Sequence, residues 1–351
     1  MPHLDGLRAI AVSAVLVHHF SRSGIPLAAN LGVKLFFVLS GFLITGLLLH
    51  ARERVEQGRT NRKTALKNFY ARRFLRIFPL YYAVIGVAIL LNITVAREYA
   101  PYLLSYTLNL KMAAQGWYVQ NFAHFWSLCV EEQFYLVWPW LLILASKRWL
   151  LPLVVVMTML GPAYRLYLLL GWSYFGLDTS GLASYIVTPT CFDSLGMGAL
   201  LAILTRGDRV ADRTRRIVLD RVLPIGAIVA ALLYVGFLFG LPGELLFGDT
   251  ASAIVFAWVV SRGARGFGGT AGRIIGWGPI RYIGRISYGI YVYHPLVFAV
   301  IAFGVAEMGL GIDERSVAGI TMGFLLTLTI ATASWFLMER PVNELKRYFP
   351  S

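Results

Sequence analysis

The sequence is poor in charge and in cysteine. Only 14% of its 351 residues are Asp, Glu, Lys or Arg, whereas soluble globular domains carry about 25%. Its two cysteines, Cys129 and Cys191, lie in or beside apolar runs, and their number and spacing predict neither a disulfide framework nor a metal site. The first residues lack the basic, apolar and small-residue pattern of a signal peptide, so we expect the first apolar run to be retained.

Apolar residues are in excess. They make up 58% of the chain, and the mean hydropathy is +0.65. This composition predicts an all-α, polytopic transmembrane helical bundle. Because we find no repeat, low-complexity region or soluble segment, we expect residues 1–351 to form a single membrane-embedded domain.

Apolar runs of helical length predict about ten membrane spans. Several are shorter than the ~20 residues that a span usually needs, and the stretch 99–110 is a candidate for a further partial span or re-entrant helix. The predicted spans are 7–21, 32–50, 77–95, 128–145, 150–170, 191–205, 222–240, 250–261, 286–303 and 317–337.

The basic residues are unevenly distributed between these spans. With both termini in the cytoplasm, 26 of the 32 Lys and Arg residues lie on the inner side, five lie outside, and Arg165 lies within a span. An excess of Lys and Arg in cytoplasmic loops is the usual signature of membrane topology. The distribution therefore predicts cytoplasmic termini and explains the net charge of +14 without a nucleic-acid partner.

Arg8 and His19 are eleven residues apart in the first apolar run. Eleven helical steps are close to three full turns and about 16 Å, so both side chains would share one face. Ionisable groups at membrane depth require a protein interior or a wet cavity. Imidazole titrates near neutral pH and suits proton transfer from a hydroxyl. The alternatives are a cytoplasmic anchor for Arg8 and a packing role for His19.

Arg73 and Arg76 are three residues apart at the start of the third span, so they would project together at the cytoplasmic surface, near Arg72. Guanidinium groups bind phosphate oxygens in a bidentate manner. The alternative to phosphate binding is anchoring to lipid headgroups.

Glu131 and Glu132 lie in the aromatic run FWSLCVEEQFYLVWP, where a carboxylate at membrane depth is costly unless paired or protonated. One of them could orient His19, as a carboxylate does in hydrolytic triads. The alternative is an ion pair with Arg165 or another arginine. Trp126 and Ser127 are candidate substrate-site residues, and the alternative for the serine is a helix N-cap.

A third polar site is expected in GRISYGIYVYHPLV, where Tyr288 and His294 are candidate substrate-site residues. The alternatives are an interfacial tyrosine and a polar contact at a proline kink. Gly196 and Gly198 are expected to allow close helix packing.

Taken in order, these motifs resemble the acyltransferase-3 family of integral-membrane acyltransferases over nearly the whole chain. The matching segments are LDGLRAIAV with its Arg-x10-His spacing, GVKLFFVLSGFLIT, ARRFLRIFP with Arg-x2-Arg, FWSLCVEEQFYLVWP, GRISYGIYVYHP and the closing ERP. The chain departs from the family at CFDSLGMGALL, where Cys191 stands in place of the usual arginine.

The resemblance implies ten spans with cytoplasmic ends, in agreement with the charge distribution. It implies an acyl-CoA donor, usually acetyl-CoA, consumed as a substrate, so no permanently bound cofactor is expected. It assigns catalysis to His19, and donor binding or the acyl path to Arg8, Arg73 and Arg76. Some members carry an extracytoplasmic hydrolase-like domain; we expect this chain, without one, to complete the transfer itself.

We therefore expect an inner-membrane O-acyltransferase that modifies a hydroxyl group of a sugar, a polysaccharide or another envelope or secreted molecule. His19 would act as general base; a covalent acyl-histidine is the alternative. Arg8 would bind the donor or stabilise developing oxyanion charge. The alternative acceptor is a macrolide-type natural product. A polytopic transporter or flippase is the alternative of another class, although no inverted repeat is evident.

Overall fold

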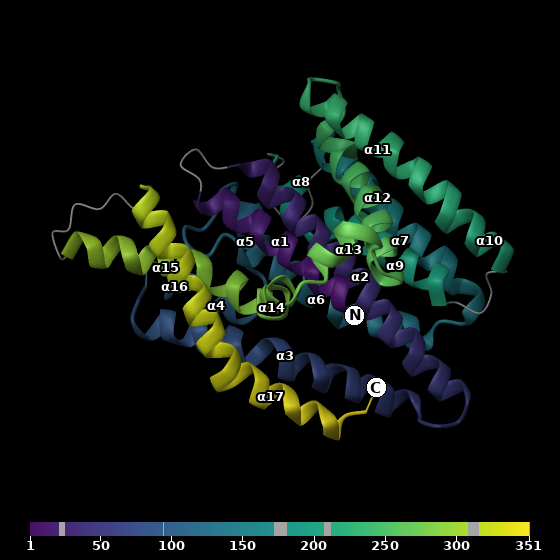
Figure 1. The fold of residues 1–351 in the computed structure, drawn as a ribbon, viewed down its shortest axis with the longest axis horizontal. Coiled ribbons are helices and arrows are strands. Elements are labelled where there is room, and N and C mark those ends of the chain that lie inside the picture. The colour runs from purple at the N-terminus through teal and green to yellow at the C-terminus, as the bar shows by residue number, and fades with distance from the viewer. Residues whose placement is uncertain (21–24, 94, 172–180, 207–211, 308–315, 351) are drawn as a thin grey trace.

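The computed structural model describes residues 1–20, 25–93, 95–171, 181–206, 212–307 and 316–350. Every regular element in these ranges is a helix, which confirms the predicted all-α fold (Figure 1). The helices of at least 15 residues are α1 (Pro2–Phe20), α2 (Pro26–Glu56), α3 (Arg62–Leu90), α6 (Phe125–Leu144), α7 (Lys147–Leu169), α9 (Phe192–Arg206), α11 (Leu223–Leu238), α12 (Glu244–Arg265), α15 (Ser287–Glu307) and α16 (Val317–Ser334). The shorter ones are α4 (Ala100–Leu104), α5 (Leu108–Gln115), α8 (Ala183–Ile186), α10 (Asp212–Ile217), α13 (Gly269–Ile275), α14 (Gly278–Arg285) and α17 (Arg340–Glu344), with single 3-10 or π turns at η1 (Thr188–Cys191), η2 (Val218–Val222), η3 (Trp335–Glu339) and η4 (Leu345–Tyr348).

Each predicted span corresponds to one of the ten longer helices. Among the described residues, seven helical segments are long and apolar enough to cross a membrane, and they contain α2, α3, α7, α9, α11, α12 and α16. The chain is therefore a multi-pass membrane protein. The three remaining predicted spans correspond to α1, α6 and α15, which carry most of the predicted polar site.

The stretch 99–110 does not form a span. It holds α4 and the start of α5, two helices of five and eight residues, which at 1.5 Å per residue are too short to cross a bilayer. Tyr106, between them, stacks on Tyr81 of α3 at 4.2 Å between ring centroids.

The central helix is α2, which packs against α1, α3, α6, α9 and α12. Its contact with α9 is close because glycines face the neighbouring backbone. A Cβ added at Gly41 would lie 2.0 Å from the Leu195 carbonyl oxygen, and one at Gly198 would lie 2.1 Å from that of Val38. A Cβ at Gly196 would meet Thr158 at 2.3 Å. The prediction that Gly196 and Gly198 permit close packing is confirmed.

The third span begins earlier than the hydropathy pattern indicates. Asn61 caps α3, accepting a hydrogen bond from the Thr64 amide at 2.8 Å, which satisfies a donor that the first helical turn leaves open. The basic segment before Ile77 is therefore helical and continuous with the apolar span, so Arg73 and Arg76 lie on a rigid helix.

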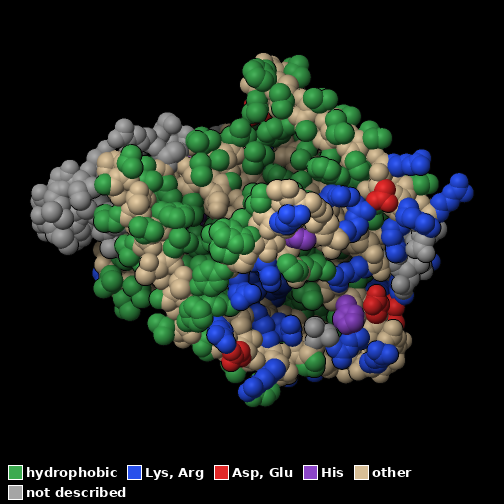
Figure 2. Space-filling view, in the orientation of Figure 1, with side chains coloured by type: hydrophobic (Ala, Val, Ile, Leu, Met, Phe, Trp, Pro, Cys, Tyr) green, Lys and Arg blue, Asp and Glu red, His purple; other side chains and the backbone are tan. Residues whose placement is uncertain are grey.

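Basic side chains gather in one region of the molecular surface. In Figure 2, Lys and Arg cover much of the right and lower-right part of the visible face, around both chain termini, while the left part is largely hydrophobic. This clustering agrees with the charge distribution expected from the sequence.

Candidate active site

Residues from five helices line a central cavity. They include seven of the predicted site residues: Arg8 from α1, Arg73 and Arg76 from α3, Ser127, Glu131 and Glu132 from α6, and Tyr288 from α15. The middle of α2, from Val33 to Ile44, forms another wall. The fold thus assembles motifs that lie up to 280 residues apart in the sequence.

Carboxylate, guanidinium and hydroxyl groups lie together in the central cavity. Ser40 donates a hydrogen bond to Glu131, and Tyr135 donates one to Ser40 at 3.1 Å. The Arg73 guanidinium lies 5.2 Å from the centroid of the Tyr135 ring. Glu131 and Glu132 therefore line the same cavity as Arg8, Arg73 and Arg76, whereas Arg165 is not among its described lining residues.

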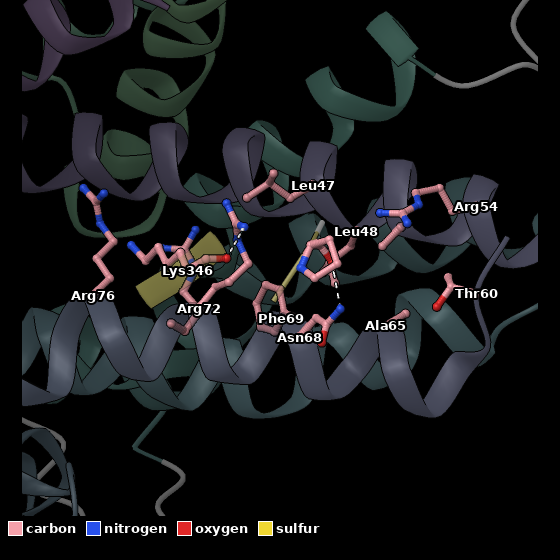
Figure 3. Close-up of a pocket in the computed structure, with 13 residues that line it drawn as sticks. Leu47, Leu48, Arg54, Thr60, Ala65, Asn68, Phe69, Arg72, Arg76 and Lys346 are labelled. Atoms are coloured by element: carbon pink, nitrogen blue, oxygen red, sulfur yellow. Dashed lines mark hydrogen bonds between the residues drawn. The ribbon is translucent and has the colours of Figure 1, made fainter. Parts of the chain in front are cut away.

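A second cavity shares Arg73 and Arg76 with the central one. We call it the basic cavity because Arg54, Arg72 and Lys346 also line it. Figure 3 shows these side chains between α2 and α3.

The C-terminal segment closes one side of the basic cavity. Arg72 donates to the Phe349 carbonyl oxygen at 3.0 Å. Asn68 donates to the carbonyl oxygen of Pro350 at 2.8 Å (Figure 3). Such a concentration of guanidinium and ammonium groups favours an anionic ligand.

His19 lies outside both cavities. It is in the last turn of α1, and its side chain is exposed, which differs from the predicted position inside the bundle. Its ring packs against His294 at 4.8 Å between centroids, and His294 lies 5.2 Å from His124. We call His19, His124 and His294 the histidine cluster; the latter two are buried.

The start of α6 joins the histidine cluster to the central cavity. Ser127 and Tyr291 line that cavity, and their hydroxyl oxygens are 2.6 Å apart. Tyr291 also donates to the His124 carbonyl oxygen at 3.0 Å, and the Tyr291 carbonyl oxygen lies 2.8 Å from Nδ1 of His294. These hydrogen bonds connect the lining of the central cavity to the buried residues His124 and His294.

Two interpretations from the sequence differ from this arrangement. Neither Glu131 nor Glu132 has a described contact with His19, whose ring neighbours are His18 and His294. Ser127 is not the N-cap of α6, which begins two residues earlier after His124. Its hydroxyl donates to the His124 carbonyl oxygen at 3.1 Å instead.

The other predicted substrate-site residues also have defined places. Tyr288 donates to the Ile77 carbonyl oxygen at 2.9 Å. Trp126 is buried, and its ring packs against Phe37 at 5.8 Å and Tyr185 at 5.1 Å. Trp126 thus forms part of the wall beside the cavity rather than its lining.

Arg165 belongs to a separate buried charge network between α7, α9 and α12. Its guanidinium donates to Asp193 at 2.5 Å and to Asp249 at 3.3 Å. Lys34 of α2, fully buried, binds Asp249 at 2.6 Å. Lys34 is one of the five basic residues that the predicted topology places outside, and it forms an ion pair in the protein interior. Asp193 lies in the CFDSLGMGALL segment, where the chain departs from the family, and it pairs with an arginine of another helix, α7.

Sequence reasoning missed several residues that shape the site. His124 immediately precedes the FWSLC motif, and its position beside a site motif was an available signal. Ser40 lies within the matched GVKLFFVLSGFLIT segment. Arg54 and Lys346 give no local signal, because they join Arg73 and Arg76 only through the packing of α2, α3 and the C-terminal segment.

Comparisons with known proteins agree with these motifs. A family model described as an acyltransferase domain, of the acyltransferase-3 type, matches residues 1–338. The chain is 29% identical to the peptidoglycan O-acetyltransferase OatA of Listeria monocytogenes, across 98% of this chain and 56% of the relative. It is 27% identical to the putative peptidoglycan O-acetyltransferase YrhL of Bacillus subtilis, across 98% of this chain and 55% of the relative.

The O-acetyltransferase OatA of Staphylococcus aureus is 25% identical, across 98% of this chain and 57% of the relative. The chain therefore spans little more than half the length of these relatives. No solved structure matches it. The relatives' names support the prediction of an acyltransferase enzyme, and the match of the family model to nearly the whole sequence shows that the chain belongs to the acyltransferase-3 family.

Proposed function

We propose that this chain moves an acetyl group from cytoplasmic acetyl-CoA to a hydroxyl group of an envelope polysaccharide in the inner membrane. The observation that carries the proposal is the shared wall of two cavities: Arg73 and Arg76 line both the basic cavity and the central cavity. Acyl-CoA has phosphates at one end and a long uncharged arm at the other. Its phosphates would lie in the basic cavity and its arm in the central cavity. The relatives' names support peptidoglycan as the polysaccharide class.

The donor would enter from the basic cavity. Guanidinium and ammonium groups of Arg72, Arg73, Arg76 and Lys346 would bind the phosphates of CoA. The pantetheine arm would then extend through the central cavity past Arg8 toward Ser127 and Tyr291. Since Arg8 lines the same cavity as Arg73 and Arg76, it is assigned to donor binding rather than to the oxyanion.

The chemistry would take place where the central cavity meets the histidine cluster. The imidazole of His19 accepts the proton of the acceptor hydroxyl, whose oxygen forms a bond to the thioester carbonyl carbon. The carbon–sulfur bond then breaks, and the CoA thiolate leaves and takes up the proton from the imidazolium. His294, rather than Glu131 or Glu132, is the residue assigned to position the His19 ring, because the two rings are in contact.

The role of His19 is tested by labelled acetyl transfer with purified protein in lipid nanodiscs. His19→Ala should fold, bind acetyl-CoA and transfer no acetyl group. His50→Ala is the matched control, because His50 is also exposed but lies near the C-terminal end of α2, away from His19. Turnover by His19→Ala at the wild-type rate would remove the base from the scheme. The same assay separates acyl transfer from transport, because a transporter leaves the label on CoA.

Phosphate binding is tested by comparing acetyl-CoA with acetyl-dephospho-CoA, which lacks the 3′-phosphate. Hydrogen bonds to charged groups contribute about 1.5–3 kcal/mol each, so Arg73→Gln or Arg76→Gln should raise the donor KM about 10- to 150-fold. The variant that loses the 3′-phosphate contact should no longer distinguish the two donors. Arg62→Gln, an exposed change at the start of the same helix, is the control. Unchanged donor KM values in both variants would exclude this phosphate site.

A further inference from the structure

A third cavity lies at the end of α2 opposite the basic cavity. Asn30 in the first turns of α2 lines it, whereas the basic cavity begins at Leu47. Seventeen helical residues separate these two positions by about 25 Å. We call this space the tyrosine cavity, because Tyr118, Tyr185 and Tyr234 line it.

The tyrosine cavity is at the same end of the molecule as His19. In the antiparallel contact of α1 with α2, a Cβ at Gly32 would meet Ala11 at 2.6 Å and Val15 at 3.0 Å. His19 is one helical turn beyond Val15 and therefore lies toward the start of α2, as Asn30 does. A ligand in this cavity would thus approach from the side opposite to the proposed donor.

Three side chains within residues 124–127, at the start of α6, connect the three environments. His124 belongs to the histidine cluster through its contact with His294, and Ser127 lines the central cavity. Between them, Trp126 packs against Tyr185 of the tyrosine cavity at 5.1 Å. One aromatic contact therefore separates this cavity from the region where we place the chemistry.

The lining of the tyrosine cavity is aromatic and polar, and its charges are all negative. Asn30 and Ser184 offer amide and hydroxyl groups, and Glu244 and Asp249 offer carboxylates. No Lys or Arg is among its described lining residues. Because Asp249 is paired with Lys34 and Arg165, the exposed Glu244 dominates the charge that a ligand would meet.

We infer that the tyrosine cavity binds the acceptor as an uncharged oligosaccharide segment. Tyrosine rings present rigid surfaces on which the C–H face of a pyranose can pack, together with a hydroxyl for hydrogen bonding. Amide and carboxylate oxygens accept hydrogen bonds from sugar hydroxyls, whereas Glu244 repels anionic polymers. The Lys34 ammonium lies 5.0 Å from the Tyr185 ring centroid, and this cation–π contact helps to fix the position of the ring.

The assignment rests on the proposed function, and its test measures binding separately from transfer. Calorimetry with the full chain in nanodiscs compares a neutral N-acetylglucosamine tetramer with a galacturonic acid tetramer of equal length. Wild type should bind the neutral probe more tightly. Tyr118→Ala should weaken binding about five- to tenfold, the loss of one aromatic contact, and raise the acceptor KM equally without changing the donor KM. Tyr118→Phe should retain binding because the ring remains.

Two further variants isolate the location and the charge. Tyr102→Ala removes an exposed tyrosine of α4 that lines none of the three cavities and should change neither binding nor transfer. Glu244→Lys should reduce the preference for the neutral probe. An unchanged affinity in Tyr118→Ala, or equal affinity of wild type for both probes, would overturn the assignment.

The two proposals fail in different ways. If acetyl transfer occurs but Tyr118→Ala leaves the acceptor KM unchanged, the cavity is wrong and the enzyme activity stands. If no acetyl transfer occurs but Tyr118→Ala still weakens tetramer binding, the cavity stands and the activity is wrong. If wild type neither binds nor acetylates the tetramer, the assignment of an uncharged glycan is refuted.

Discussion

Replacing Arg165 by methionine should destabilise the bundle strongly, because this guanidinium is the only described cation bound to Asp193. The Asp193 side chain is fully buried, and Arg165 donates to it at 2.5 Å. Arg165 also donates to the carbonyl oxygens of Thr190 at 2.8 Å and Leu246 at 3.0 Å. Removing one partner of a buried ion pair costs about 3–5 kcal/mol, because it leaves the other charge uncompensated.

The charge itself can be separated from the lost packing by a second substitution. Asp193→Asn in the Arg165→Met background removes the orphaned carboxylate, while Thr250 and the Ser194 amide remain close enough to bond the new side chain. We expect the double variant to recover about 0.5–3 kcal/mol relative to Arg165→Met, which is the range of coupling energies for residues in one network.

The measurement is denaturant unfolding in detergent, followed by circular dichroism and by thiol labelling of Cys129, which is free and fully buried in the folded state. The control is Arg340→Met, which breaks an exposed ion pair to Glu344 and should cost at most about 1 kcal/mol. If Arg165→Met costs no more than this control, or if the double variant is less stable than the single one, the argument from buried charge is refuted.

Two further predictions concern packing and the histidine cluster. Gly198→Ala should lose about 1–3 kcal/mol of unfolding free energy in the same assay, because its Cβ would lie 2.1 Å from a backbone oxygen of α2. The control is Gly86→Ala within α3, where the Cβ meets no atom within 4 Å; this change should be neutral or gain up to about 1 kcal/mol. Equal losses in the two variants would contradict the packing argument. In acetyl-transfer assays, His294→Phe should lower kcat while leaving the donor KM unchanged, because His294 packs against His19 and lies outside the basic and central cavities. A changed donor KM with normal kcat would show that His294 contacts the donor instead.

The sequence by itself determined the class of the protein and which side chains share one face of a helix. Low charge and high hydropathy require a membrane environment, because an apolar surface of this extent is not stable in water. Helical spacing also determined that Arg73 and Arg76 project together, since residues three apart share a helix face in any fold. These conclusions depend on local geometry and composition alone.

Only the tertiary structure decided which of these polar groups meet. His19 faces His294, 275 positions later, instead of a carboxylate, and Arg165 binds Asp193 and Asp249 instead of Glu131 or Glu132. Hydropathy and periodicity show which face of a span is polar but not which helix that face contacts, because lipid tails and apolar protein surfaces are equally hydrophobic neighbours. The pairing of the helices is instead determined by close packing at glycines, as between α2 and α9, and by buried charges that require a partner.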